Sequence, residues 1–264
     1  MSCRARTPAV AGTFYPSEPG ALRTAVVDLL ADAGGPLPGV RGVVAPHAGY
    51  AFSGTVAARA FAALPFVADP TVWLLGPAHH LPVHGCAVPS AAALATPLGT
   101  IEVAQDVVAA LLATVPDSRV WNEAHRAEHC LEVHLPFLTV RFGPCRVVPV
   151  LVGEAASEPL AAYLAPLLAA DPQALVVASS DLSHWHTDTV ARRRDQLYLA
   201  AIERGDLAAI RAGEACGRAA IAVLALVAQE LGWQPTVLSY LNSGAVTGEY
   251  GSVVGYGAVA YAEA

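Results

Sequence analysis

Apolar runs of strand length alternate with helix-like segments through most of the chain, and this alternation restricts the fold most strongly. Such runs occupy residues 42–46 (GVVAP), 71–77 (TVWLLGP), 145–153 (CRVVPVLVG) and 174–180 (ALVVASS). Continuous apolar runs are typical of strands that are covered on both faces of a sheet. We therefore predict a single three-layer α/β domain over residues 1–264, with a central, mostly parallel or mixed sheet and helices on both faces.

The segments around these runs predict the remaining elements. We expect a helix that opens at Ser53, and further helices over 103–115, 157–170, 190–204 and 218–231. Short strands are expected around 86–88 and 100–103, and two glycine-punctuated strands over 235–243 and 251–262 close the chain.

Composition excludes several classes of protein. The formal net charge is -7, which argues against a nucleic-acid binder. All 15 basic residues are arginine, so lysine Schiff-base chemistry and a Walker-type phosphate loop are excluded. The five cysteines include no CxxC pair and predict reduced thiols. With neither a signal-peptide core nor an apolar run of membrane-spanning length, we expect a soluble cytoplasmic protein.

Polar, titratable side chains follow three of the apolar runs. The first run leads to His47, the second to His79 and His80, and the run at 174–180 to Asp181 and His184. Ligands of open α/β sheets bind beyond the carboxyl ends of the strands, so these side chains could share one pocket. A single loop histidine is usually solvated, but imidazoles repeated at strand ends are typical of catalytic metal sites with an open position.

A second cluster, EAHRAEHCLEVHLPFL at 123–138, interleaves carboxylates with imidazoles. If it is helical, His125 and His129 share a face, and Pro136 limits the helix. Three roles stay open for this cluster. It could form a rival metal site, it could supply hydrogen-bonding or proton-transfer partners to another site, or it could be a solvated helix start. Asp181 likewise admits a plainer interpretation as a helix cap.

Blocks spread over the whole chain resemble one family. They are AGTFYP, APHAGYAFSG, LGPAHH, EHCLEVHLPF, VPVLVG, SSDLSHW and ACGR, in this order. In order and approximate spacing they resemble the Memo family, and the chain looks like its prokaryotic branch, named AmmeMemoRadiSam system protein B.

The resemblance implies the α/β fold of class III extradiol ring-cleaving dioxygenases, which hold non-haem Fe(II) with two histidines and a carboxylate. Memo proteins resemble these enzymes with a cysteine in place of the carboxylate. The resemblance thus implies His47, His79 and Cys216 as metal ligands, while His80 turns away or forms a hydrogen bond nearby. The residues that it places at the border of the same pocket, as candidates for catalysis, are Asp181, His184, Glu132 and His134, with His184 as acid/base.

A thiolate ligand shifts the metal preference toward softer or borderline ions, so iron or copper is expected, with zinc as a further candidate. The leading hypothesis is a metal-binding, redox-active or oxygenase-like protein, and catalysis itself stays open. One alternative is a non-catalytic adaptor that holds a peptide, a small molecule or a partner protein in the cleft. Another is a metal-assisted hydrolase with Glu132 as general base. The family name implies AMMECR-type and radical SAM partner proteins, and the apolar composition suits a homo-oligomer.

Overall fold

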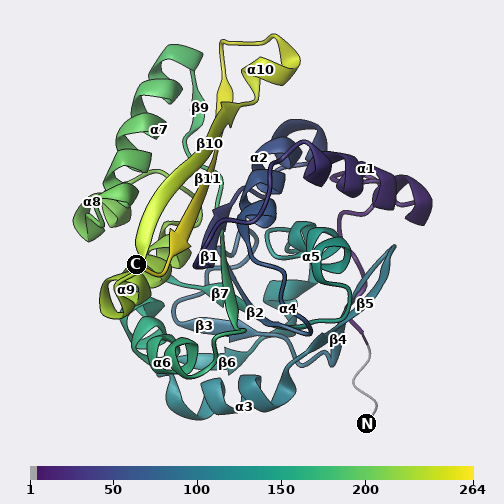
Figure 1. Cartoon of the computed structure of the whole chain (residues 1–264), viewed down its shortest axis with the longest axis vertical. Helices are drawn as coiled ribbons and strands as arrows, with labels where there is room; N and C mark the ends of the chain where they lie inside the picture. Colours follow the sequence, from purple (N-terminus) through teal and green to yellow (C-terminus); the bar gives the residue numbers. More distant parts are fainter. Residues whose placement is uncertain (1–4) are drawn as a thin grey trace.

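A mixed, eleven-stranded sheet runs through residues 5–264, which are the residues that the computed structural model describes (Figure 1). Its main path has the order β10 (Gln234–Asn242), β11 (Val253–Ala262), β1 (Val40–Ala45), β8 (Leu175–Ser179), β2 (Thr71–Gly76), β7 (Arg146–Val152), β3 (Cys86–Val88) and β6 (Ser118–Val120). Off this path, β5 (Gly99–Val103) pairs with β4 (Ala93–Thr96) and β7, and β9 (His184–His186) pairs with β11.

The four central strands β1, β8, β2 and β7 are mutually parallel. β11 adds to β1 in the antiparallel direction, and β10 adds to β11 in the same way. Every residue of β1 and β8 is buried, as expected for strands covered on both faces. The carboxyl ends of the parallel strands therefore meet at one edge, where a site can form.

Helices cover both faces of this sheet. They are α1 (Pro19–Ala31), α2 (Tyr50–Ala63), α3 (Gln105–Thr114), α4 (Asn122–Arg126), α5 (Leu135–Phe142), α6 (Ser157–Ala170), α7 (Asp188–Glu203), α8 (Leu207–Ala212), α9 (Arg218–Leu231) and α10 (Gly244–Thr247). α1, α2 and α5 pack together on one face, and α6, α7, α8 and α9 follow one another on the other (Figure 1). The predicted three-layer α/β architecture is confirmed.

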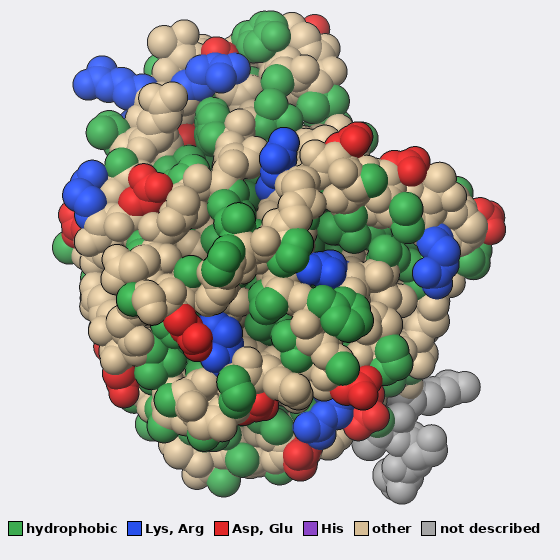
Figure 2. Space-filling view, in the orientation of Figure 1, with side chains coloured by type: hydrophobic (Ala, Val, Ile, Leu, Met, Phe, Trp, Pro, Cys, Tyr) green, Lys and Arg blue, Asp and Glu red, His purple; other side chains and the backbone are tan. Residues whose placement is uncertain are grey.

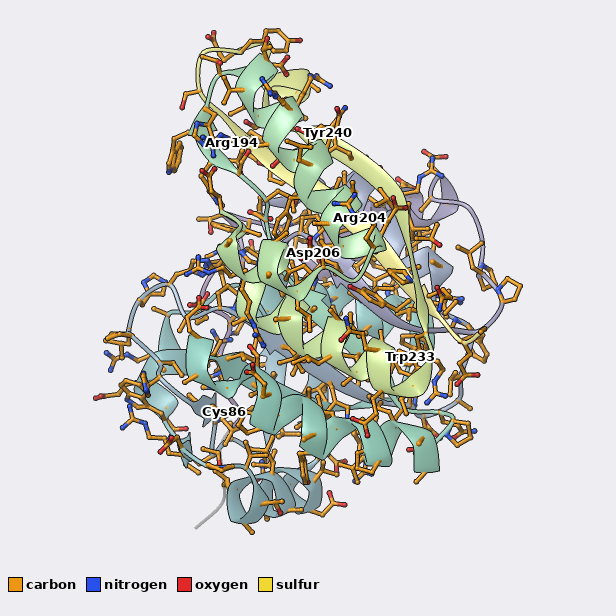
Figure 3. The ribbon with its side chains drawn as sticks, turned by 90° about the vertical axis from the view of Figure 1, so that its left-hand side faces the viewer. Cys86, Arg194, Arg204, Asp206, Trp233 and Tyr240 are labelled. Atoms are coloured by element: carbon orange, nitrogen blue, oxygen red, sulfur yellow. The ribbon has the colours of Figure 1, made fainter. Side chains whose placement is uncertain are left out.

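Figure 3 shows α7 lying along β10, so the strand at this end of the sheet is not left bare. Tyr240 of β10 donates its hydroxyl proton to the buried Asp195 of α7, with an oxygen–oxygen distance of 2.8 Å. Asp195 also accepts from the backbone of Ser183, 2.9 Å away. These bonds tie the antiparallel end of the sheet to the segment that follows β8.

One local expectation was wrong, and the condition attached to a second is not met. α2 begins at Tyr50 rather than Ser53, whose buried hydroxyl donates to the carbonyl of Ala48 inside the first turn. The 123–138 segment is not one helix, because α4 ends at Arg126 and a short 3-10 turn at 132–134 precedes α5. Pro136 lies in the first turn of α5, where its missing N–H costs nothing, so it begins a helix instead of limiting one.

No helix within residues 5–264 has both the length and the apolar character needed to cross a membrane. Charged side chains of both signs are scattered over the face shown in Figure 2. The four cysteines in this part of the chain, Cys86, Cys130, Cys145 and Cys216, are free thiols, as expected, and Cys3 lies outside the described residues.

Candidate metal centre

The ends of three neighbouring parallel strands bring the candidate histidines together. β8 lies between β1 and β2 in the sheet, so His47, after β1, and His79, after β2, face each other across the end of β8. Their ring centroids are 5.1 Å apart. His47 is buried, whereas the side chain of His79 is 29% exposed, so the centre is open to solvent on the His79 side.

Cys216 reaches the same place from the residues before α9. Its Sγ lies 3.2 Å from Nε2 of His47, and donor atoms of His47, His79 and Cys216 all lie within 4.8 Å of one another. The backbone N–H of Asp181 points at the sulfur, 3.3 Å away. Two imidazoles and one thiol that are far apart in the sequence thus surround a common point.

A hydrogen-bond network decides which nitrogen of His47 is free. Ser179 Oγ lies 2.7 Å from each of three atoms, namely the carbonyl oxygen of Cys130, His47 Nδ1 and His134 Nε2. The hydroxyl has one proton, which it donates to the carbonyl, so both ring nitrogens must donate to it. His47 therefore carries its proton on Nδ1, and its Nε2 lone pair faces Cys216.

Glu128 fixes His79 in the same way. Its Oε1 lies 2.9 Å from His79 Nδ1, and its Oε2 accepts from the His79 backbone N–H at 2.6 Å. Burial alone would raise the pKa of Glu128, but hydrogen bonds from His79 and from Cys130 N–H outweigh it and bring the pKa to about 2. The carboxylate is an acceptor, so His79 Nδ1 is the donor and Nε2 is free. Carboxylate-bound histidines of this kind are typical metal ligands.

A third imidazole, His129, borders the centre and was not among the predicted site residues. Its ring stacks on His79 with a centroid distance of 4.8 Å and lies 5.4 Å from His47. Phe14 packs against His129 at 4.8 Å. Burial lowers the pKa of His129 to about 4, so the ring is neutral at pH 7. The signal that could have found it is its place directly after Glu128, inside a conspicuous block.

Asp181 and His184 also lie at this border. Asp181 Oδ1 accepts from the backbone N–H of His47 at 2.8 Å and does not cap a helix, since α7 begins at Asp188. Burial raises the pKa of Asp181 to about 7. His184, in β9, is half-buried and close enough to His47 to contribute to the lowering of its pKa. His80 is exposed.

The other two predicted residues occupy different surroundings. His134 is fully buried behind His47 and reaches it only through Ser179. Glu132 is also buried, but its carboxylate accepts hydrogen bonds from the N-terminal segment of the chain. His125 lies apart from the centre and faces the carbonyl oxygen of Ala87 at 3.0 Å. The interpretation of this cluster as a solvated helix start is wrong.

Two of the three donor groups, His47 and Cys216, are neutral at pH 7 before an ion binds. Burial, followed by the neighbouring imidazoles, lowers the pKa of His47 well below its usual value. Burial, followed by the nearby Asp181, raises the pKa of the Cys216 thiol to about 12. Two imidazole nitrogens and one sulfur fit a borderline or soft cation, whose binding would deprotonate the thiol.

Comparisons with known proteins identify the family of the chain. A family model described as Memo-like protein matches residues 6–260. A MEMO1 family protein of Methanosarcina acetivorans is 36% identical over 268 residues, which cover 96% of this chain and 98% of the relative. A MEMO1 family protein of Aeropyrum pernix is 36% identical over 280 residues, with 96% and 98% coverage. The chain therefore belongs to the Memo-like protein family.

Proposed function

We propose that the chain binds a single transition-metal ion through Nε2 of His47, Nε2 of His79 and Sγ of Cys216. The observation that carries this proposal is the orientation of the two rings. Each Nδ1 is held by an acceptor, Ser179 or Glu128, which leaves both Nε2 lone pairs free beside the sulfur. A protein that merely packed these histidines would have no need to orient both lone pairs toward one thiol.

The donor set favours iron or copper, and zinc is a further candidate. Three protein donors leave an open coordination position, and an ion there would supply Lewis-acid or one-electron redox chemistry to a small ligand. His129 and His184 lie beside this position, and each can donate a hydrogen bond to such a ligand or accept one from it. The proposed class is thus a redox-active or oxygenase-like protein with a His/His/Cys centre.

The test is metal analysis of protein purified without oxygen, followed by titration of the metal-free protein with Co²⁺, Zn²⁺ and Cu⁺. We expect saturation with one ion per chain, and a thiolate charge-transfer band with Co²⁺ that is lost in Cys216→Ser. Cys145→Ser is the matched control, because Cys145 precedes β7 at the opposite end of the parallel strands. Binding of less than about a tenth of an equivalent, unchanged in His47→Ala, would refute the proposal.

The hydrolytic alternative has less support, because it needs a Glu132 carboxylate that is free to take a proton from water. Both oxygens of Glu132 are engaged by the N-terminal segment. The adaptor alternative draws on Trp185, whose φ of 64° is rare for a bulky residue and whose side chain is 76% exposed next to His184. AMMECR-type and radical SAM proteins are the partners to test, and binding that survives His47→Ala and Cys216→Ser would favour an adaptor over a metalloenzyme.

A further inference from the structure

Residues 5–15, which run into the AGTFYP block, supply none of the proposed ligands, yet they cross the segment that supports the centre. We call residues 5–15 the N-terminal strap and residues 125–134 the support loop. The strap starts as a backbone addition to β4, where Arg6 N–H donates to Ala93 at 2.9 Å and Ala95 N–H donates back at 2.8 Å. It then passes over the support loop as far as Tyr15.

Glu132 anchors the strap to the support loop. Its carboxylate accepts from Arg6 Nη1 at 2.8 Å, from the backbone of Ala9 and Val10 at 2.7 and 3.0 Å, and from the Tyr15 hydroxyl at 2.7 Å. A carboxylate offers about four acceptor sites, so this group is fully used. Since Glu132 is only 1% exposed, the four donors also replace the water that its charge has lost.

Arg6 holds the support loop at two further points. Its Nε donates to the carbonyl oxygen of His125 at 2.7 Å, and its Nη2 donates to the carbonyl oxygen of Glu128. The Arg6 side chain is only 12% exposed, so little water competes for these bonds. A guanidinium makes such a fork of bonds in fixed directions, which a single ammonium cannot reproduce.

The support loop in turn holds both proposed imidazole ligands. Glu128 orients His79, as described above. His134 and the carbonyl of Cys130 flank Ser179, which orients His47. Phe14 of the strap also packs against His129, which borders the centre. A displacement of the loop would therefore misplace both lone pairs at once.

We propose that the N-terminal strap is a positioning element of the metal centre, and that Arg6 and Glu132 set its metal affinity although they do not contact the ion. The inference rests on the proposed function. It assigns Glu132 a positioning role in place of the general-base role that the hydrolytic alternative requires. By thermodynamic linkage, an ion whose ligands are oriented by the ordered loop also favours the docked strap.

The test compares Co²⁺ affinity, measured by competition with a chelator, in the wild-type chain and in Arg6→Ala. This variant keeps the backbone bonds to Ala93 and Ala95 while removing the fork. We expect a loss of affinity of about tenfold, the lower end of what removal of an outer hydrogen-bond partner costs, with the thiolate charge-transfer band retained. Arg6→Lys should stay close to Arg6→Ala, because charge alone does not restore three directed bonds. Arg146→Ala, which breaks the exposed pair with Asp106, is the control and should bind like wild type.

Hydrogen exchange supplies a second readout. In Arg6→Ala, the amides of 128–130 should exchange faster, and in the wild type Co²⁺ should slow exchange at Ala9 and Val10. If Arg6→Ala proves unstable, Tyr15→Phe removes one bond to Glu132 and should lower the affinity by a smaller factor. Wild-type binding with unchanged affinity in these variants would overturn the strap's role and leave the proposed function standing. Failure of the wild type to bind any of the three ions would overturn both.

Discussion

The hydroxyl of Ser179 is the polar atom on which two buried imidazoles depend. Ser179 is the last residue of β8, and this strand is buried along its whole length, so the position of the hydroxyl is fixed. With Oγ bonded to three groups at 2.7 Å, it orients His47 and satisfies one nitrogen of His134. Substitutions at Ser179 should therefore affect the proposed metal centre, although Ser179 is not one of its proposed ligands.

Ser179→Ala should lower the affinity for Co²⁺ by about tenfold, because His47 loses the acceptor that fixes its tautomer. The same change leaves buried His134 Nε2 without its acceptor, which should lower the free energy of unfolding by about 2 kcal/mol. Chelator competition and urea denaturation measure the two effects separately.

Ser118→Ala is the matched control for this substitution. Its hydroxyl donates to the carbonyl oxygen of Val115 at 2.6 Å, next to β6 at the far end of the sheet. We expect a loss of stability of about 1 kcal/mol with metal affinity unchanged. Equal metal affinity in Ser179→Ala and wild type would show that Ser179 does not orient His47.

At the level of single residues, the sequence pointed to the two candidate ligands that follow buried strands, and the structure brings their rings together. His47 and His79 stand directly after apolar runs, and a strand end is a position that the chain pattern reveals. Cys216 has no such signal, since it follows a short helix, and only the family resemblance pointed to it. His129 was missed because its approach to His79 depends on how the support loop folds. Contacts with residues more than a hundred positions away determine that fold.

The packing of the start of α9 against the end of β8 sets the distance of Cys216 from the sheet. Gly217 precedes α9, and a Cβ added to it would lie 2.2 Å from the carbonyl oxygen of Ser179 and 2.7 Å from Cβ of Ser180. The first of these atoms belongs to the backbone of a central strand, so it cannot move aside cheaply. The close approach of helix and strand therefore requires glycine.

Gly217→Ala should push the start of α9, and Cys216 with it, away from the strand end. We expect a loss of about 2 kcal/mol in the free energy of unfolding, as for an overpacked core, together with weaker Co²⁺ binding. Thermal denaturation and the intensity of the thiolate band report the two effects.

Gly35→Ala serves as its control. A Cβ at Gly35 meets nothing within 4 Å among the residues described, so stability should stay the same or rise by up to about 1 kcal/mol. If Gly217→Ala were equally harmless, the distance between β8 and α9 could not be what positions the sulfur.

Elements that are buried on both sides were predictable, because their composition alone identifies them. The runs at 71–77 and 174–180 correspond to β2 and β8 within a residue or two at each end. The short strands β4 and β6 were not anticipated, since each exists mainly through pairing with a neighbour. The sequence left the conformation of the support loop open. Its carboxylates and imidazoles have helical spacing, but its carbonyl and carboxylate oxygens accept hydrogen bonds from Arg6 and Ala9.

On the scale of the whole molecule, several histidines are buried in neutral form, and this makes the fold sensitive to acid. Burial lowers the pKa of His134 to about 3 and that of His125 to about 4, against about 6.5 in an unfolded chain. Between these folded pKa values and 6.5, the unfolded chain binds protons at these histidines and the folded chain does not, so the free energy of unfolding rises with pH. Their contribution is complete above about pH 6.5 and is lost as the pH falls toward 4 and 3.

We expect the free energy of unfolding of the metal-free protein to fall steeply below about pH 6.5. In His125→Gln, the total loss between about pH 6.5 and pH 4 should be smaller by about 3 kcal/mol. Glutamine is chosen because its amide can still donate to the carbonyl oxygen of Ala87, the partner of His125. Urea denaturation at several pH values, with a chelator present, measures the slope. An identical slope in the variant and the wild type would mean that His125 is protonated in the folded protein.

The strained, exposed Trp185 is an intrinsic fluorescent reporter beside the proposed metal centre. Of the other three tryptophans, Trp73 and Trp233 are buried and Trp121 is partly covered, so only Trp185 has most of its surface in solvent. Its indole lies 6.2 Å from the ring of His184, at the border of the proposed ion. Quenching of the red-edge fluorescence by Co²⁺ or Cu²⁺, absent in Trp185→Phe, would follow metal loading in solution without any added dye.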